Sequence, residues 1–290
     1  MSTQISPNNV VGRDHLIKQI WRLLERQSIV FTAERRIGKT TVLKKMCAEP
    51  PSDILVRYLD LEKVDSPRRF VEVLLSTVQD LLPRAETART AFRGLLESLG
   101  GTEIGGIIKL PDLEQQGWQS AMERTIACVC QECADATLLF LFDELPYMLQ
   151  KVAVREHQED THDNAALAIL DSMRAMRNEH ENLRMVYCGS VGLHHVIESL
   201  KKAGYASQPT NDMEKVPIGP LSSQDSLALS LRLLEAEGLS AENIDTIAAI
   251  IALKADFVPF YIERIITRLA MNGNSLTIES VESWSGFLDH

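Results

Sequence analysis

The sequence predicts an α/β fold in which helices flank a parallel sheet, followed by a small helical region. Short apolar runs alternate with segments whose apolar residues recur at helical spacing. Residues 137–142 form an almost continuous apolar run, which is typical of a strand buried on both faces of a parallel sheet. Strand patterns then largely stop after Pro220, so the last part of the chain is expected to be helical.

The strands and helices of the first region are expected to alternate along the chain, as crossover connections between parallel strands require. The patterns predict strands at residues 28–32, 54–61, 137–142 and 183–188. They predict helices at residues 38–46, 67–82, 121–136 and 165–178. Two Gly-Gly pairs and a short apolar run at residues 100–111 could form an inserted β-hairpin.

The C-terminal part of the chain reads as helices at residues 222–237, 241–254 and 259–271, with a short one at 277–284. A strand is conceivable only at residues 275–278. We therefore expect an α/β domain over residues 1–219 and a helical lid domain over residues 220–290, with the boundary near Gly219.

Charge and composition limit the classes of function. The formal net charge of −10 repels the phosphate backbone of DNA, although a local basic patch could still bind it. No apolar run is long enough to cross a bilayer, and residues 1–9 are polar and lack the apolar segment of a signal peptide. These features predict a soluble, cytoplasmic protein.

Two groups of residues invite a metal-site interpretation. Cys128, Cys130 and Cys133 are clustered, but their spacing lacks a second pair, and they lie in an expected helix, which favours buried, reduced thiols. Residues 155–163 contain His157 and His162 among carboxylates, and a solvated loop is the favoured interpretation.

A phosphate-binding loop (P-loop) is the strongest motif in the chain. It follows an expected strand and opens an expected helix, and it matches GxxxxGK[ST] except that Ala33 replaces the first glycine. Its backbone N–H groups would surround a β-phosphate, Lys39 would reach the β- and γ-phosphates, and Thr40 would ligate Mg²⁺. A chance match at a helix start is the alternative. The candidate nucleotide-binding residues are Ala33, Glu34, Arg35, Arg36, Ile37, Gly38, Lys39, Thr40 and Thr41.

Two carboxylates end the apolar strand at residues 137–142. The strand tip of an open α/β sheet faces the ligand crevice. Asp143 would hold Mg²⁺ through a water molecule, and Glu144 would polarise the attacking water as a general base. An ordinary strand end with an acidic turn is the alternative, and the presence of both motifs in the expected order counts against it.

With these motifs the chain resembles the AAA+/STAND group of P-loop ATPases, close to the archaeal ATPase family. The loop from Glu34 to Thr40 and the preceding segment Val10-Val11-Gly12-Arg13-Asp14 carry the resemblance. It implies that Val11, Gly12 and Arg13 line the base and ribose of ATP.

The resemblance assigns two further residues. Ser190 follows the strand at 183–188 and would act near the γ-phosphate as a sensor, or it is a buried, satisfied serine. Pro259 lies where the family has a GxP lid motif, but Asp256 and Phe257 replace the expected glycines, and Pro259 could simply start a helix.

The roles of several arginines remain open. Arg35 and Arg36 could neutralise phosphate, contact a neighbouring molecule or face solvent. Arg174, Arg177 and Arg184 are candidate arginine fingers only because they are basic and near the sensor strand.

Three functions follow as alternatives. The first is an ATPase that cycles between ATP and ADP, with Mg²⁺ as cofactor, and acts as a switch through a protein partner or by forming a homo-oligomer. The second is an ATP-binding regulatory module with little turnover. The third is a DNA-associated ATPase of a transposition or defence system, against which the acidic charge argues.

Overall fold

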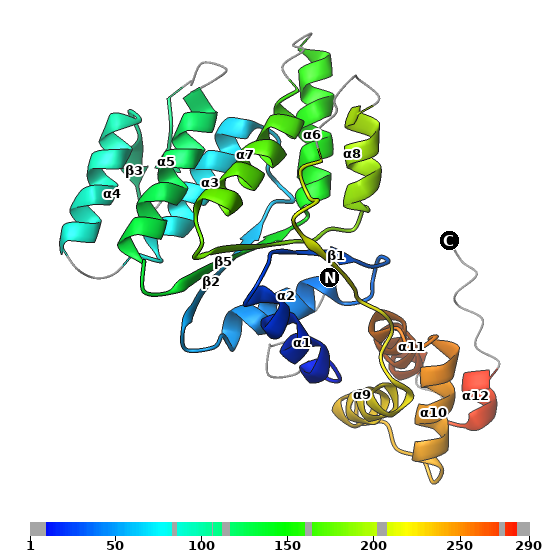
Figure 1. The fold of residues 1–290 in the computed structure, drawn as a ribbon. Coiled ribbons are helices and arrows are strands. Elements are labelled where there is room, and N and C mark those ends of the chain that lie inside the picture. Colours follow the sequence, from blue (N-terminus) through cyan, green and yellow to red (C-terminus); the bar gives the residue numbers. More distant parts are fainter. Residues whose placement is uncertain are drawn as a thin grey trace. The chain divides into compact units, whose positions relative to one another are not determined.

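A computed structural model describes residues 10–82, 86–105, 107–111, 117–159, 164–201, 208–272 and 276–282 (Figure 1). Its helices are α1 (Asp14–Leu24), α2 (Lys39–Ala48), α3 (Pro67–Gln79), α4 (Glu86–Ser98), α5 (Gly117–Glu132), α6 (Leu145–Gln158), α7 (Ala165–Glu179), α8 (Leu193–Lys201), α9 (Ser223–Ala236), α10 (Ile244–Lys254), α11 (Pro259–Asn272) and α12 (Ile278–Glu282). Its strands are β1 (Ile29–Thr32), β2 (Ile54–Asp60), β3 (Thr102–Ile104), β4 (Ile107–Lys109), β5 (Thr137–Asp143), β6 (Leu183–Tyr187) and β7 (Glu214–Pro217).

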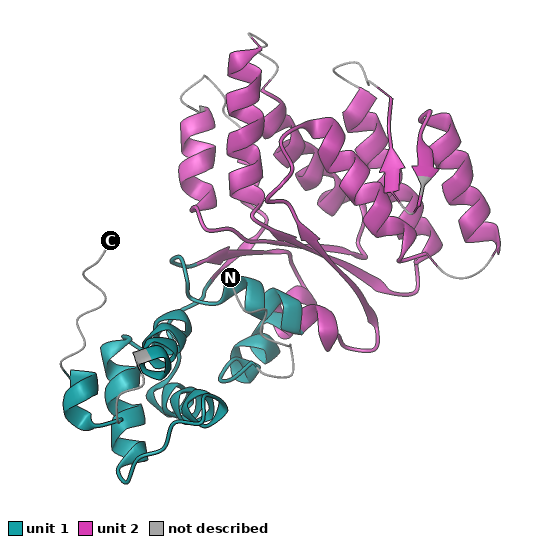
Figure 2. Ribbon diagram, turned by 180° about the vertical axis from the view of Figure 1, so that it is seen from behind, with its two compact units in different colours: residues 1–20, 33–45, 217–290 teal, residues 21–32, 46–216 magenta. Residues whose placement is uncertain are grey.

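The chain divides into two compact units (Figure 2). Unit 1 comprises residues 1–20, 33–45 and 217–290, and unit 2 comprises residues 21–32 and 46–216. The predicted phosphate loop belongs to unit 1, whereas the predicted metal-binding strand tip belongs to unit 2. The predicted domain boundary near Gly219 stays a prediction.

A five-stranded sheet organises unit 2, in the order β2-β5-β6-β1-β7. β5 pairs in parallel with β2 and β6, and β6 pairs in parallel with β1. Helices α3 to α8 lie over one face of this sheet (Figure 1). The apolar run that predicted a doubly covered strand forms β5, in which every residue from Leu138 to Asp143 is buried. The α/β prediction is therefore confirmed.

The inserted hairpin is also confirmed. β3 and β4 pair in an antiparallel arrangement, with Thr102 opposite Lys109 and Ile104 opposite Ile107. The buried face of β4 packs on α3, where Ser76 Oγ accepts a hydrogen bond from the backbone of Ile108 at 3.4 Å.

The helical part of unit 1 has its own apolar core. Leu234 of α9, Ile247 and Ile251 of α10, and Ile262 and Ile265 of α11 are all completely or almost completely buried in it. Ser222 caps α9 by accepting a hydrogen bond from the backbone N–H of Asp225 at 3.0 Å, an arrangement that helix N-termini favour.

Several details differ from the sequence predictions. Residues 276 and 277 are not in a strand, and Ile278 begins α12, so the strand considered at 275–278 is wrong for its described residues. Arg155 and His157 lie in α6 rather than in a loop, because the helix continues to Gln158. The remainder of that stretch, residues 160–163, lies outside the described residues.

The clustered thiols lie on or just after α5, as predicted. Cys130 and Cys133 are buried and Cys128 is half-buried, and all are free thiols. Burial raises the pKa of the Cys130 thiol to about 12, which disfavours the thiolate that zinc requires. The described residues contain no group of three or more His, Cys, Asp or Glu side chains that could hold a metal ion.

Candidate functional site

The loop between β1 and α2 contains two residues with positive φ. Gly38 has φ +96°, a conformation that glycine adopts without strain, whereas Ala33 is not among the residues with positive φ. Alanine at the first motif position is therefore compatible with the backbone found here. Arg36 also has a positive φ, of +69°.

Lys39 begins α2 and folds back on the loop. Its Nζ donates hydrogen bonds to the carbonyl oxygens of Glu34 at 2.6 Å and Ala33 at 3.2 Å, and the residue is only 7% exposed. A buried ammonium is therefore held in the middle of the loop, where it can exchange carbonyl partners for phosphate oxygens.

Arg13 joins the loop to the helical part of unit 1. Its guanidinium donates to Ile37 O at 2.8 Å and to Gly219 O at 2.9 Å. Burial lowers the pKa of Arg13, and the nearby Asp225 carboxylate opposes this shift. The predicted contact of Val11, Gly12 and Arg13 with base and ribose stays a prediction, but the guanidinium of Arg13 has a clear structural role.

Gly12 gives a stability prediction. Its φ is +73°, and a Cβ at this position would lie 2.5 Å from Asp225 Cβ. We expect Gly12→Ala to lower the free energy of unfolding by about 2 kcal/mol or more, because left-handed backbone alone costs an L-residue about 1–2 kcal/mol. Denaturant unfolding measures the change.

The matched control is Gly94→Ala. Gly94 lies inside α4, and apart from the adjacent backbone of that helix no described atom lies within 4 Å of the position that a Cβ would take. This variant should be more stable than the parent by about 0.5–1 kcal/mol. Equal stability of Gly12→Ala and the parent would contradict the close approach to Asp225.

Arg36 of the loop lies against aromatic rings of α11. Its guanidinium carbon is 4.8 Å from the centroid of the Phe260 ring and 5.9 Å from that of Tyr261. Such cation–π contacts are worth about 0.5–1 kcal/mol at exposed sites. The sequence left open what the Arg36 side chain contacts. The structure places its guanidinium against α11, in the helical part of the same unit.

The segment before α11 adopts glycine-like backbone without glycine. Asp256 has φ +47° and Phe257 has φ +59°, at the positions where the resembled family carries glycines. Pro259 is the first residue of α11, a position that proline favours. Its contact with nucleotide stays a prediction.

Asp143 ends β5 as a buried carboxylate, 3% exposed. Tyr58 of β2 donates its hydroxyl hydrogen to Asp143 Oδ2 at 2.9 Å, and the backbone N–H of Glu144 donates to Asp143 Oδ1 at 3.1 Å. Burial, and then the Asp143 charge, raise the pKa of Tyr58, so its phenol remains a donor. No pattern in the sequence pointed to this tyrosine.

Glu144 and Ser190 are brought together, although 46 positions separate them in the chain. Glu144 Oε2 accepts hydrogen bonds from Ser190 Oγ at 2.9 Å and from Ser190 N at 3.0 Å. Glu144 has φ +55° and stands just before α6. Two donors on one oxygen fix the direction of the carboxylate.

Two of the arginines considered as fingers have structural partners. Arg177 is buried and donates to both carboxylate oxygens of Asp212, to Pro209 O and to the Tyr187 hydroxyl. Arg184 donates to the carbonyls of Leu24 and Glu25, among others. These contacts tie the sheet to its surroundings within unit 2.

Comparison with solved structures supports the fold. A Walker-type ATPase of Pyrococcus abyssi matches 93% of this chain and 70% of its own, with 14% identity and a TM-score of 0.62. Domain III of the Thermotoga maritima replication initiation protein DnaA matches 97% of this chain and 95% of its own at 10% identity, with a TM-score of only 0.46. The Aeropyrum pernix ORC2 protein matches 98% of this chain and 74% of its own at 12% identity, with a TM-score of 0.47.

No family model matches the sequence, and no curated protein is significantly similar to it. Within the described residues, no helix has the length and apolar character needed to cross a membrane. The sheet order, the loop after β1 and the likeness to the Pyrococcus structure agree that this chain has the α/β fold of P-loop nucleoside triphosphatases.

Proposed function

We propose that this chain binds Mg-ATP through the loop at residues 33–41, hydrolyses it with Asp143 and Glu144, and uses the nucleotide as a conformational switch. The observation that carries this proposal is the pair of hydrogen bonds that Ser190 gives to Glu144. They orient a carboxylate beside the buried Asp143, at the carboxyl end of β5. β1 and β5 run in the same direction, so the chain leaves β1 for the loop at that same edge of the sheet.

Each residue then has one task. Lys39 would exchange the carbonyls of Ala33 and Glu34 for β- and γ-phosphate oxygens, and the loop N–H groups would hold the β-phosphate. Glu144 would accept a proton from the attacking water, and Ser190 would keep its carboxylate in position.

The residues fit magnesium. A threonine hydroxyl from Thr40 and a carboxylate from Asp143 are hard oxygen donors, and Mg²⁺ is usually held by one or two such groups together with phosphate and water. Asp143 is buried and receives a hydrogen bond from Tyr58, which fixes its orientation. When bound, the ion would neutralise charge that develops on the phosphates.

Two contacts within unit 1 support the switch. Arg36 lies on Phe260 and Tyr261, and Arg13 holds the carbonyls of Ile37 and Gly219. A change in the loop on nucleotide binding would therefore act directly on α11 and on the segment that leads to α9. We propose that a protein partner or further copies of the chain receive this movement.

The finer assignment to the AAA+/STAND group, close to the archaeal ATPases, is also proposed on the motifs described above. Cytoplasmic location is proposed with it, and the five free cysteines support a reducing compartment.

Thermal unfolding with and without Mg-ATP tests the proposal. A ligand present at about 100 times its dissociation constant stabilises the native state by about 2.7 kcal/mol. For a chain of this size we expect the melting temperature to rise by about 5 °C, and multiple-turnover assays to release phosphate. Indifference of the melting curve to millimolar Mg-ATP would refute the proposal.

An ATP-binding module with little turnover is the second candidate. The hydrogen bonds from Ser190 favour it as well, because they occupy Glu144 Oε2 and compete with a water molecule for that oxygen. This candidate would be selected if Mg-ATP raised the melting temperature but no phosphate were released with any of the partners tested.

A further inference from the structure

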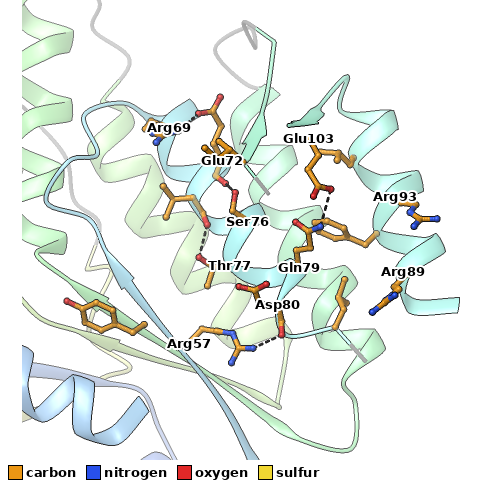
Figure 3. Close-up of a pocket in the computed structure, with 16 residues that line it drawn as sticks. Arg57, Arg69, Glu72, Ser76, Thr77, Gln79, Asp80, Arg89, Arg93 and Glu103 are labelled. Atoms are coloured by element: carbon orange, nitrogen blue, oxygen red, sulfur yellow. Dashed lines mark hydrogen bonds and ion pairs between the residues drawn. The ribbon is translucent and has the colours of Figure 1, made fainter. Parts of the chain in front are cut away.

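A pocket of about 840 Å³ lies in unit 2, among α3, α4, the β3–β4 hairpin and the edge strand β2 (Figure 3). Its size is that of a small-molecule site, for which about 300–1,000 Å³ is typical. The proposed ATPase uses none of its side chains except Tyr58. The side chains that the argument uses are Arg57, Arg69, Arg89, Phe92, Arg93 and Ile107.

Arg57 and Arg69 are engaged by the protein. Arg57 donates to the carbonyls of Val56 and Asp80. Arg69 donates to Glu72 at 2.9 Å, and Glu72 also approaches Lys109 and accepts from a backbone N–H. Although burial opposes it, these contacts hold the pKa of Glu72 below its usual value. The guanidinium groups of Arg57 and Arg69 are therefore already held by oxygen atoms of the protein.

Arg89 and Arg93 differ from that pair. They stand four residues apart on the exposed side of α4, and in the described part of the chain neither makes an ion pair or a side-chain hydrogen bond (Figure 3). Residues four apart on a helix lie about 6 Å apart along its axis, so two long guanidinium side chains can reach one anionic group. The Glu103 carboxylate on the opposite wall accepts a hydrogen bond from Gln79 at 3.0 Å.

Apolar surface lies beside these two cations. Phe92 stands between them in the sequence of α4 and forms part of the pocket wall, as do Val73 and Leu96. Ile107 lies at the tip of the hairpin and is 54% exposed, so its side chain is accessible to a ligand in the pocket. The pocket therefore offers an anion-binding side and an apolar side.

We propose that this pocket binds a small organic anion, in which a phosphate or carboxylate group is joined to an apolar ring or chain. Arg89 and Arg93 hold the anionic group, and Phe92, Leu96 and Ile107 contact the apolar part. Guanidinium groups suit this task because they form paired, charge-assisted hydrogen bonds with planar carboxylates and with phosphates. The proposal does not rest on ATP hydrolysis, since none of the side chains that it uses takes part in the proposed ATPase site.

The test is fluorescence titration of the full chain with 2-naphthyl phosphate and with 2-naphthoate, in saturating Mg-ADP. The two probes distinguish phosphate from carboxylate, and the Lys39→Ala variant repeats the measurement without a working phosphate loop. We expect binding of at least one probe, weakened by salt. Arg89→Gln combined with Arg93→Gln should weaken it by about tenfold or more, the worth of one lost charge-assisted contact.

Arg22→Gln combined with Arg26→Gln is the matched control. These two arginines are also exposed, also four residues apart and also in unit 2, so the net charge changes equally. Affinity should be unchanged in this control. Ile107→Ser should weaken the naphthyl probes several-fold while leaving the binding of inorganic phosphate as it was, because it removes only apolar contact.

Several outcomes would overturn the proposal. They are the absence of binding by either probe at millimolar concentration, equal binding by the Arg89/Arg93 double variant and the parent, and equal affinity for inorganic phosphate and naphthyl phosphate. A poly-glutamate peptide that binds with the same arginine dependence while both probes fail would also overturn it, in favour of a docking surface for an acidic protein segment.

Discussion

Lys39→Ala should reduce the affinity for Mg-ATP by about a hundredfold or more, because the phosphates lose a charged donor in a largely buried loop. In the structure the ammonium already bonds to the carbonyls of Ala33 and Glu34, so it needs no large movement to reach a ligand. Isothermal titration with a slowly hydrolysed ATP analogue measures the change directly.

Lys18→Ala is the control for the loss of one positive charge, since Lys18 is exposed on α1. It should bind nucleotide as the parent does. Melting temperatures of both variants without nucleotide show whether each is folded. If Lys39→Ala bound ATP as tightly as the parent, the assignment of the loop would be wrong.

Glu144→Gln should lower the turnover of ATP by about two orders of magnitude, the usual contribution of a positioned general base. The amide keeps the size of the side chain, and its oxygen can still accept the two hydrogen bonds from Ser190. Affinity should persist because Lys39, Thr40 and Asp143 are unchanged. The variant should therefore accumulate in its ATP-bound state.

Two further variants make the assignment specific. Ser190→Ala keeps the base but removes one of its donors, so turnover should fall less than in Glu144→Gln. Asp143→Asn should lose Mg²⁺-dependent affinity as well as rate. Parental turnover in Glu144→Gln would show that Glu144 is not the base.

The sequence predicted the parts of this molecule that depend on local pattern. The apolar run before Asp143 identified β5, and its register with β2 and β6 places the two carboxylates at a strand end. The loop motif could be recognised in the sequence because its chemistry depends on consecutive residues. The edge strand β7 was missed because its sequence, Glu-Lys-Val-Pro, buries only Val216 and shows no apolar run.

Contacts between distant residues could not be predicted in this way. Nothing in the local pattern predicts the hydrogen bond from Ser190 to Glu144, or the contact of Arg36 with the Phe260 ring. The backbone after α10 could not be predicted either. Asp256 and Phe257 replace the glycines of the resembled family, yet both residues adopt the left-handed backbone that glycine would provide. Hydrogen bonds from Phe257 N to Ala252 O and from Leu221 N to Phe257 O accompany that conformation.

The bond from Arg13 to Gly219 has a consequence for the order of events during synthesis. It joins residues 206 positions apart, and the same guanidinium supports the loop at Ile37. The loop is translated early, but its support is complete only about 180 residues later, when Gly219 has been synthesised at about 5–20 residues per second. A nascent chain therefore spends several seconds or longer with its phosphate loop synthesised but without the hydrogen bond from Arg13 to Gly219. That bond can form only once synthesis has reached the segment that leads to α9.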